Sequence, residues 1–511
     1  MVHTVEGVDR RGLMMMVAAA GVSLLTPRLG WAKARGLGGD LSDVSAVIDR
    51  QQPEALERLQ DWIALPTIVA EQRNVQEGAV YMQGLLKDAG FQTTSIIQTD
   101  GSPGVFGEMD NGAPRTVGMY FMYDVKQFDP SEWSSPPLEG RIVDRPGLGK
   151  VMIGRGATNQ KGPQASFLAA LHALKASGRK MPVNIVVVAE GEEEIASPHF
   201  PQIVHRPEVL AALSRCKEVW MPMNSQSPSG AVEVVLGAKG TIEVELTCTS
   251  KAWGRGALGD IHSSFKADVD SPVWRMIKAL STLTSEDGND PTIDGFNEHV
   301  KPLTARQKEL LDEEAARVPE ADVKKTLGVQ RWVRDLSYRE AIERLASQPT
   351  VNIEGMYAGY TGPGGKTLLP SKAVVKLDLR LVPDQTAAEA AEKLKAHLAR
   401  RGYGDIQVNV TGGYNPTQTD EHSALIQTSL AVYKAAGLDV GLSPRAAGSW
   451  PGYIFTDPPV GLPAGHFGFG HGALQHVPNE YFVIESTVPK LRGMRGATLG
   501  YAEFLYALAA T

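Results

Sequence analysis

The chain has 511 residues, more than a single compact hydrophobic core organises, so we expect two domains or more. Hydrophobic residues make up 42% of it and charged residues 21%, as in an ordinary globular enzyme. The net charge of −7, with both signs interspersed and no basic tail, argues against nucleic acid as a partner.

The N-terminal stretch, residues 1–34, has the layout of an export signal. Two arginines, Arg10 and Arg11, precede a short apolar run, and the residues AKA at 32–34 fit the A-x-A cleavage pattern. This resembles a twin-arginine signal peptide and predicts a mature chain that begins near Arg35 in a bacterial periplasm. The alternative is a membrane anchor, but the apolar run is shorter than the ~20 residues of a spanning helix. No other segment is long and apolar enough to span a bilayer, so we expect no membrane association after cleavage.

Helical and strand patterns alternate from residue 35 to 236. The strand-like runs are short and almost continuously apolar, as in strands buried on both faces. The expected elements are helices at 52–65 and 75–90, a strand at 115–125, a helix at 161–178, and strands at 182–190 and 217–224. This alternation predicts an α/β domain whose first part is 35–236.

The pattern changes at residue 237, where 241–250 alternates polar and apolar residues like a sheet with one solvated face. The elements expected next are a helix at 271–283, a polar helical insertion at 285–345, a strand at 373–382, a helix at 386–402 and a strand at 405–412. We therefore predict an inserted α+β domain over 237–415 and a return to the first domain over 416–511. The two cysteines, Cys216 and Cys248, lie in apolar runs without CxxC spacing, which predicts buried free thiols.

Polar residues gather at the ends of the predicted strands and in the loops after them. These stretches are MYDVKQFDP (122–130), GRGATNQKGP (154–163), AEGEEEIASPHF (189–200) and MPMNSQ (221–226), with HGALQHVPNEY (471–481) late in the chain. The carboxyl ends of strands in an α/β sheet border one crevice, so we expect the stretches to meet there. Adjacent glutamates alone would indicate a solvated acidic turn, but in this constellation Glu193 and Glu194 indicate a site.

Taken in this order, and with LDLRLVPDQT at 377–386, these stretches resemble the co-catalytic di-zinc metallopeptidase family. That family includes aminoacylases, acetylornithine deacetylases, glutamate carboxypeptidases and carnosine-type dipeptidases. The resemblance extends over essentially the whole mature chain. It implies an α/β fold with a mixed-sheet, zinc-peptidase-like catalytic domain and a smaller inserted α+β, ferredoxin-like domain that serves as lid and dimerisation domain. It also implies a homodimer.

The resemblance assigns positions to the metal site of the family. Two of the five ligand positions keep the family's residue types, as Glu194 and His476. The other three carry Met122 in place of His, and Asn159 and Asn224 in place of Asp. Zinc takes His nitrogen, Cys thiolate or carboxylate oxygen, whereas a thioether suits Cu(I) and Asn offers only a neutral oxygen. We therefore expect at most one divalent ion, such as zinc, held weakly by Glu194 and His476, with a site that holds no metal as the alternative.

The resemblance makes Glu193 the general base and places Asp124 with it among the catalytic residues. Without dications, Glu193 and Glu194 do not both ionise easily, so one pKa rises and a proton donor stands beside an acceptor. The amides of Asn159 and Asn224 can donate to a substrate carbonyl or carboxylate. Such a pocket suits general acid–base chemistry better than hydrolysis of an unactivated amide, because no metal lowers the pKa of water.

Other matching positions concern the substrate. The resemblance implies that His262 reaches a neighbouring active site and polarises the scissile carbonyl, and that Arg380 grips a substrate carboxylate, for which its planar fork is suited. It also implies that Asn352, Gly448 and Ser449 contact the substrate. It gives no role to the two histidines of GHFGFGH, at 466 and 471, which we expect to be structural or at the pocket rim.

Three functions fit these residues. The first is an exported peptidase or amidohydrolase that acts on a small carboxylate-bearing amino acid, peptide or N-acyl amino acid, with Glu193 as base and a metal-poor site. The second is a metal-independent lyase or isomerase on the same scaffold. The third is a non-catalytic protein that binds carboxylates, which would not require the acid pair.

Overall fold

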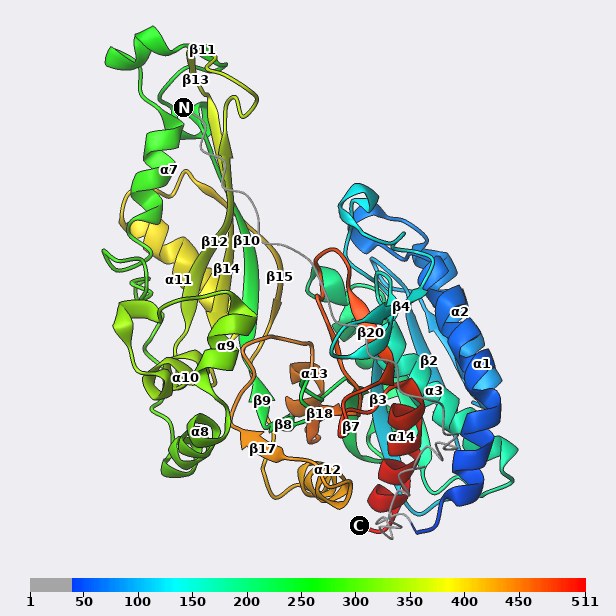
Figure 1. The fold of residues 1–511 in the computed structure, drawn as a ribbon. Coiled ribbons are helices and arrows are strands. Elements are labelled where there is room, and N and C mark those ends of the chain that lie inside the picture. Colours follow the sequence, from blue (N-terminus) through cyan, green and yellow to red (C-terminus); the bar gives the residue numbers. More distant parts are fainter. Residues whose placement is uncertain (1–38) are drawn as a thin grey trace, which may run out of the picture. The chain divides into compact units, whose positions relative to one another are not determined.

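The computed structural model describes residues 39–511, so the predicted signal peptide, 1–34, and the start of the mature chain lie outside the described residues. The largest sheet of the described residues has six strands (Figure 1). In sheet order its strands are β1 (Thr93–Ile97), β2 (Gly104–Met109), β6 (Asn184–Glu190), β3 (Thr116–Met122), β7 (Cys216–Pro222) and β18 (Ala464–Phe467). The last four are parallel, which places their carboxyl ends at one edge. β3 and β6 read as continuous apolar runs because both of their faces are buried.

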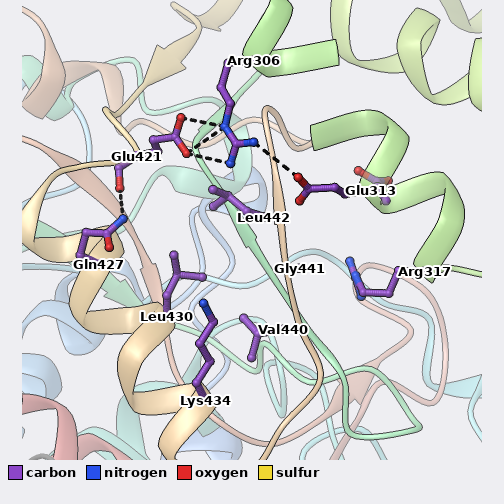
Figure 2. Close-up of a pocket in the computed structure, with 11 residues that line it drawn as sticks. Arg306, Glu313, Arg317, Glu421, Gln427, Leu430, Lys434, Val440, Gly441 and Leu442 are labelled. Atoms are coloured by element: carbon purple, nitrogen blue, oxygen red, sulfur yellow. Dashed lines mark hydrogen bonds and ion pairs between the residues drawn. The ribbon is translucent and has the colours of Figure 1, made fainter. Parts of the chain in front are cut away.

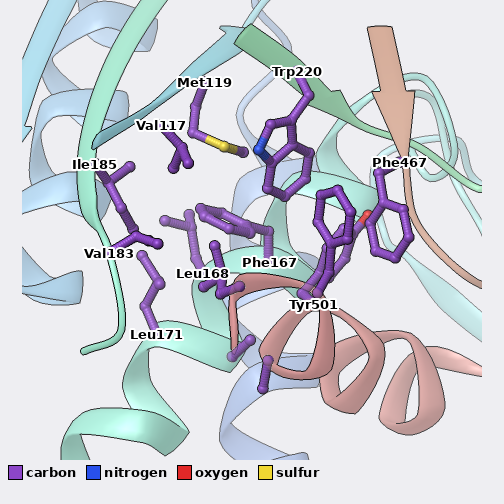
Figure 3. Packing of buried hydrophobic residues seen from close by; sticks show 14 of the residues in the cluster. Val117, Met119, Phe167, Leu168, Leu171, Val183, Ile185, Trp220, Phe467 and Tyr501 are labelled. Atoms are coloured by element: carbon purple, nitrogen blue, oxygen red, sulfur yellow. The ribbon is translucent and has the colours of Figure 1, made fainter. Parts of the chain in front are cut away.

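Helices cover one face of this sheet with a large apolar core. They are α1 (Ser42–Ala64), α2 (Val75–Ala89), α3 (Lys161–Ala176), α12 (Ala424–Ala435) and α14 (Met494–Ala509). Phe167 of α3 packs edge-on against Phe121, Trp220 and Tyr501, at ring-centroid distances of 5.9, 5.4 and 5.7 Å (Figure 3). This packing fixes the strands whose ends carry the polar stretches.

The opposite face packs against shorter helices, α4 (Phe200–Val204), α5 (Pro207–Leu213) and α13 (Tyr453–Thr456). Met122 and Met221 belong to this second core, at the carboxyl ends of β3 and β7. A separate four-stranded sheet, in the order β19 (Gly472–Ala473), β20 (Tyr481–Ser486), β5 (Gly149–Ile153) and β4 (Arg141–Arg145), carries the loops that follow 153 and precede 481.

The inserted segment forms an antiparallel sheet in the order β12 (Thr350–Ala358), β14 (Lys372–Leu381), β10 (Gly240–Thr249) and β15 (Gln407–Tyr414). The helices α7 (Pro272–Leu280) and α11 (Ala387–Arg400) pack on one face (Figure 1). The chain order β10, α7, β12, β14, α11, β15 is the βαββαβ pattern of a ferredoxin-like unit. The predicted fold class is confirmed. The sheet lies within the expected 237–415, although the precise domain boundaries stay predictions.

The polar insertion predicted at 285–345 is helical, with α8 (Ala305–Arg317), α9 (Glu320–Leu327) and α10 (Tyr338–Ser347). Thr304 and Ser337 cap α8 and α10 through capping boxes. The insertion is not fully solvated, because Leu310 and Leu311 of α8 are buried. α8 packs on β17 (Val440–Ser443), which pairs with β8 (Val232–Val235).

Both cysteines are buried and free, as predicted. Among residues 39–511, no helix has the length and apolar character needed to cross a membrane.

Candidate active site

Three carboxyl groups meet where β3 and β6 end. Asp124 follows β3, and Glu193 and Glu194 begin the 3-10 turn η3 (Glu193–Ile195) that follows β6. β3 and β6 are parallel neighbours, so their ends bring the acids together. The Asp124 Oδ2 atom accepts a hydrogen bond from the Glu194 backbone nitrogen at 3.0 Å, and both side chains are buried. The sequence prediction that these stretches meet is confirmed for these acids.

Burial and mutual repulsion favour the protonated form of this acid group. Burial, and then the charge of Glu194, raise the pKa of Asp124 to about 8. Burial, followed by the charges of Glu194 and Asp124, raises the pKa of Glu193 well above its usual value. The Lys126 Nζ atom lies 3.7 Å from Glu194 Oε2, and the Lys126 side chain is partly exposed. The site therefore holds protons at neutral pH, as expected for carboxyls crowded in a low dielectric.

Glu480 positions the second predicted stretch. It is fully buried, pairs with Arg155 at 2.8 Å, and accepts backbone hydrogen bonds from Gly156, Thr158 and Asn159 at 2.8–3.0 Å. Such a carboxylate, satisfied from several donors, fixes the loop that follows β5. It thereby directs the Asn159 side chain at the acid group.

Asn159 stands between the two remaining candidate metal ligands. Its amide nitrogen donates to Glu194 Oε1 at 2.7 Å and lies 3.1 Å from His476 Nε2, which is itself 3.2 Å from Glu194 Oε2. The amide N–H groups of Asn159 thus face the lone pairs of Glu194 and His476 that a cation would need. Among the described residues, no group of three or more His, Cys, Asp or Glu side chains is arranged to hold a metal. This donor set does not fit a zinc ion bound in the usual way.

A cavity of about 330 Å³ adjoins the acid group, and we call it the central cavity. Its lining comprises Met122, Asn159, Gln160, Glu193, Met221, Met223, Ser225, Glu233, Val234, Val235, Ala238, Tyr433, Ala446, Gly448, Ser449, Trp450 and His466. Of the residues predicted from the sequence, it brings together Met122, Asn159, Glu193, Gly448 and Ser449. His476 stands outside it with its side chain 51% exposed.

Met223 reaches the central cavity directly after β7, and Ser225 follows it in the lining. Asn224, predicted at a ligand position, instead donates through its amide to Thr158 Oγ1 at 2.8 Å and does not line the cavity. Met223 accepts a hydrogen bond from Gln160 through its sulfur, at 3.1 Å. The sequence reasoning missed Met223, although the period-2 alternation of a strand places it on the same face as Met221.

Arg380 connects the inserted sheet to the central cavity. It lies on β14 and donates through Nη1 to Ser449 Oγ at 2.9 Å, while its Nε atom donates to Asp378 at 3.0 Å. Burial, followed by the charges of Arg445 and Arg380, lowers the pKa of Lys239 to about 8. Arg380 thus brings a guanidinium group to the edge of the cavity through Ser449.

The other two predicted substrate residues lie apart from the cavity within one chain. Asn352 is exposed on the edge strand β12. His262 is exposed in β11 (Ile261–His262), where its Nδ1 atom lies 2.8 Å from Ser264 Oγ. Of the two GHFGFGH histidines, His466 lines the cavity, and His471 is buried between Gln226 and Tyr481.

A buried polar network supports the acid loop from the inserted sheet, and the sequence reasoning missed it. Tyr414, the last residue of β15, donates to the Glu193 carbonyl oxygen at 2.9 Å and lies 3.0 Å from Ser197 Oγ. Ser197 and Tyr120 both donate to Glu190 Oε1, at 2.8 and 2.9 Å. No sequence pattern distinguishes Tyr414, because its partners come from other domains of the chain.

A second cavity, of about 310 Å³, lies between α8 and α12 and contains no predicted site residue (Figure 2). Its charged walls pair with each other: Arg306 contacts Glu421 at 3.1 Å and Glu313 at 3.4 Å. The central cavity is therefore the candidate active site.

Comparison with known proteins identifies relatives of this chain. Residues 123–497 match the sequence model described as peptidase family M20/M25/M40. The chain is 26% identical over 369 residues to the Cys-Gly metallodipeptidase of Candida albicans, covering 69% of this chain and 73% of the relative. It is 25% identical over 405 residues to the human Beta-Ala-His dipeptidase, covering 74% and 76%.

Two solved structures share the fold. An M20 family metallo-carboxypeptidase of Sulfolobus solfataricus superposes with a TM-score of 0.78 at 28% identity, over 90% of this chain and all of the other. Human carnosine dipeptidase 1 superposes with a TM-score of 0.76 at 21% identity, over 92% of this chain and all of the other.

Proposed function

We propose, on the premise that this chain belongs to peptidase family M20/M25/M40, that it acts on a small carboxylate-bearing amino acid, peptide or N-acyl amino acid. The chain is a hydrolase of this family. One observation carries the proposal: the central cavity has the acid Glu193 in its lining and, at Ser449, a hydrogen bond to the guanidinium of Arg380. A carboxyl group that can exchange protons and a guanidinium group that can bind a carboxylate are thus both available to a ligand of the central cavity.

The substrate class is supported from two sides. Relatives named for Cys-Gly and Beta-Ala-His dipeptides act on molecules that end in a free carboxylate. Arg380 and Ser449 offer donors for such a group. An Arg fork holds a carboxylate through two parallel hydrogen bonds, which fixes its orientation as well as its charge.

Glu193 is the proposed acid–base residue. It takes the proton of the attacking water and delivers it to the nitrogen that leaves. Burial, followed by the charges of Glu194 and Asp124, raises its pKa, which makes its carboxylate a stronger base than an exposed one. Asp124, whose Oδ2 atom accepts a hydrogen bond from the Glu194 backbone nitrogen, holds the turn in place.

The site is proposed to be metal-poor. The support lies in the donor set, in which the Asn159 amide already fills the space between Glu194 and His476. The expected outcome is turnover that EDTA does not reduce, in protein purified without chelator and containing far less than one equivalent of any divalent metal. Activity that is lost in EDTA and restored by zinc would contradict this.

The Glu193→Gln variant tests the reaction assignment. We expect turnover to fall at least about a hundredfold, as for loss of a general acid–base group, while binding of carboxylate ligands is retained. Asp129→Asn, at an exposed capping position outside the cavity, is the control and should keep full activity. Turnover that survives Glu193→Gln would show that another group acts as base.

A metal-independent lyase or isomerase is the second candidate, favoured by the raised carboxyl pKa values in a site whose donor set does not fit zinc. Turnover in ¹⁸O-labelled water separates the two, because hydrolysis places one labelled oxygen in the acid product and elimination or isomerisation places none. Binding without any turnover would indicate the third function, a carboxylate-binding protein.

We further propose export and dimerisation. The twin-arginine pattern at Arg10 and Arg11 supports a periplasmic protein, and replacement of both residues by Lys should leave the full-length chain in the cytoplasm on fractionation.

The homodimer is supported by the edge strand β12, on which Ile353, Met356 and Tyr357 are 42–50% exposed.

A further inference from the structure

The deep wall of the central cavity consists of thioethers, aliphatic groups and an indole. Met122 ends β3, Met221 lies near the end of the neighbouring strand β7, and Met223 follows that strand directly; all three line the cavity. Trp450 and Val235 complete this part of the lining. In the family pattern, the position of Met122 carries a histidine that binds zinc. The methionine replaces this polar side chain with an apolar one.

Two polar side chains, His466 and Gln160, adjoin this wall, and the Gln160 amide donates to the Met223 sulfur at 3.1 Å. His466 lies on β18, in register with Met221, and its ring centroid is 4.6 Å from that of Trp450. Within the part of the chain that the structure describes, the imidazole has no hydrogen-bond partner. Burial alone lowers its pKa to about 4, so it is neutral at pH 7 and offers one donor and one acceptor.

We propose that the thioether wall of the central cavity binds the apolar group of an amphipathic monocarboxylate, such as an N-acyl amino acid or a dipeptide with an aromatic or aliphatic side chain. The carboxylate end rests on the proposed function of Arg380 and Ser449. The new element is selectivity for the apolar group through Met122, Met221 and Met223.

Physical chemistry favours such a ligand over a small polar dipeptide. Apolar surface removed from water stabilises the complex in proportion to its area, by about fourfold in affinity for each buried methylene. Methionine side chains adapt to aromatic and aliphatic shapes alike and contact ring edges favourably. A polar side chain against this wall would lose its water and find few partners, such as His466 and the Gln160 amide.

The cavity volume limits the ligand. About 330 Å³ lies at the lower end of small-molecule sites, which suits one acyl chain or ring and not a long peptide. Affinity should therefore rise with chain length and then level off once the cavity is full.

The test is a binding series by calorimetry on the mature-length Glu193→Gln protein, which does not consume its ligands. The probes are N-acetyl-, N-butanoyl-, N-hexanoyl- and N-benzoylglycine, with glycylglycine as the polar comparison. We expect Kd to fall about fourfold per methylene over the first additions, N-benzoylglycine to bind well and glycylglycine to bind weakly. Affinity that is independent of acyl length would overturn the proposal.

Variants of the wall locate the effect. Met221→Gln and Met223→Gln should each weaken N-hexanoylglycine binding about tenfold and leave N-acetylglycine nearly unchanged. Met223→Leu keeps the apolar surface without the sulfur and should keep the affinity. Leu258→Gln, at a side chain 82% exposed and outside the cavity, is the control and should change nothing. If a Gln variant does not fold, as judged by its melting temperature, the dependence of Kd on acyl length in the protein with the unaltered wall still tests the proposal.

A soft cation is the alternative ligand that a cluster of thioethers can bind. Titration with Ag(I) separates the two, because stoichiometric binding that Met223→Leu abolishes would overturn the proposal. The outcome is also distinct from failure of the proposed function. Chain-length-dependent binding without hydrolysis would refute only the hydrolase mechanism, and hydrolysis indifferent to acyl length would refute only the apolar wall.

Discussion

Asn159 illustrates how one atom changes a site. A carboxylate at this position would offer lone pairs toward Glu194 and His476, whereas the amide offers a hydrogen to both. The nitrogen therefore does locally what a cation would otherwise do, since it holds a carboxylate and an imidazole 3.2 Å apart. The adjacent backbone is fixed by Glu480, so the side chain has little freedom to turn away.

Asn159→Asp should restore zinc binding. The change removes the N–H donor and adds a third protein ligand to Glu194 and His476, which is the number that open zinc sites use. We expect the zinc content after dialysis against zinc and then buffer to rise from well below one equivalent toward one, measured by plasma mass spectrometry.

The matched control is Asn224→Asp, which adds the same charge but stands against Thr158 and outside the cavity. It should not raise the zinc content. Equal zinc in both variants would instead support Asn224 as a ligand position, as predicted from the sequence.

At the scale of elements, the acid turn is held from two sheets. β6 and β3 position it from the central sheet, and β15 of the inserted sheet reaches it through Tyr414. Gly412 of β15 packs so closely that an added Cβ would stand 2.4 Å from the Ala196 Cβ atom, which no side chain tolerates. The inserted domain therefore contacts the turn that carries Glu193 directly.

Tyr414→Phe should lower kcat about tenfold with little change in KM. It removes the hydrogen bond to the Glu193 carbonyl and leaves Ser197 with one partner fewer, at a cost of about 1–2 kcal/mol. Because the hydroxyl acts through the position of Glu193, the pH profile of kcat should shift as well.

Tyr453→Phe is the matched control, since its ring lies 6.3 Å from that of Tyr414 and no hydrogen bond joins its hydroxyl to the described part of the acid turn. Its kinetics should stay close to those of the unaltered protein. If the Tyr414→Phe variant keeps an unchanged kcat and pH profile, the hydrogen-bond network has only a structural role.

At the scale of the whole molecule, one chain does not bring every predicted residue to the cavity. His262 and Asn352 are exposed on the inserted domain, whereas Arg380 of the same sheet reaches Ser449. If His262 acts on the site of a second copy, as the family resemblance implies, two chains are needed to complete one site.

Subunit complementation tests this. Each of the variants His262→Ala and Glu193→Gln should be inactive alone, but co-expressed chains should form mixed dimers with one complete site and recover about a quarter of the activity. Light scattering after gel filtration should report a dimer in each preparation. Failure of the mixture to recover activity, with mixed dimers present, would show that His262 does not act on the partner's site, and an active His262→Ala protein would place His262 outside the reaction.

The edge strand β12 gives a further check on the dimer. Ile353→Lys should shift the mass measured by light scattering toward the monomer, because a charge would be buried in an apolar interface. Val80→Lys, on α2 of the first domain and 59% exposed, is the matched control and should leave the mass unchanged. A dimer that persists in Ile353→Lys would place the interface elsewhere.

Several features followed from the sequence alone because they depend on local patterns. Continuous apolar runs indicated strands buried on both faces, alternation indicated the one-sided sheet of the inserted domain, and polar stretches after strands indicated the shared crevice. The fold class, the family and the meeting of Asp124 with Glu193 and Glu194 were predictable for this reason.

Only the tertiary structure decided what each neighbouring residue does at that crevice. Whether Met223 or Asn224 turns into the cavity depends on how β7 leaves the sheet beside β18, where the Met223 nitrogen still donates to Phe467. The role of Tyr414 depends on contact between two sheets, through which it meets Glu193, 221 residues away in the chain. Such contacts are set by packing of distant segments, and packing leaves no periodic signal in the sequence.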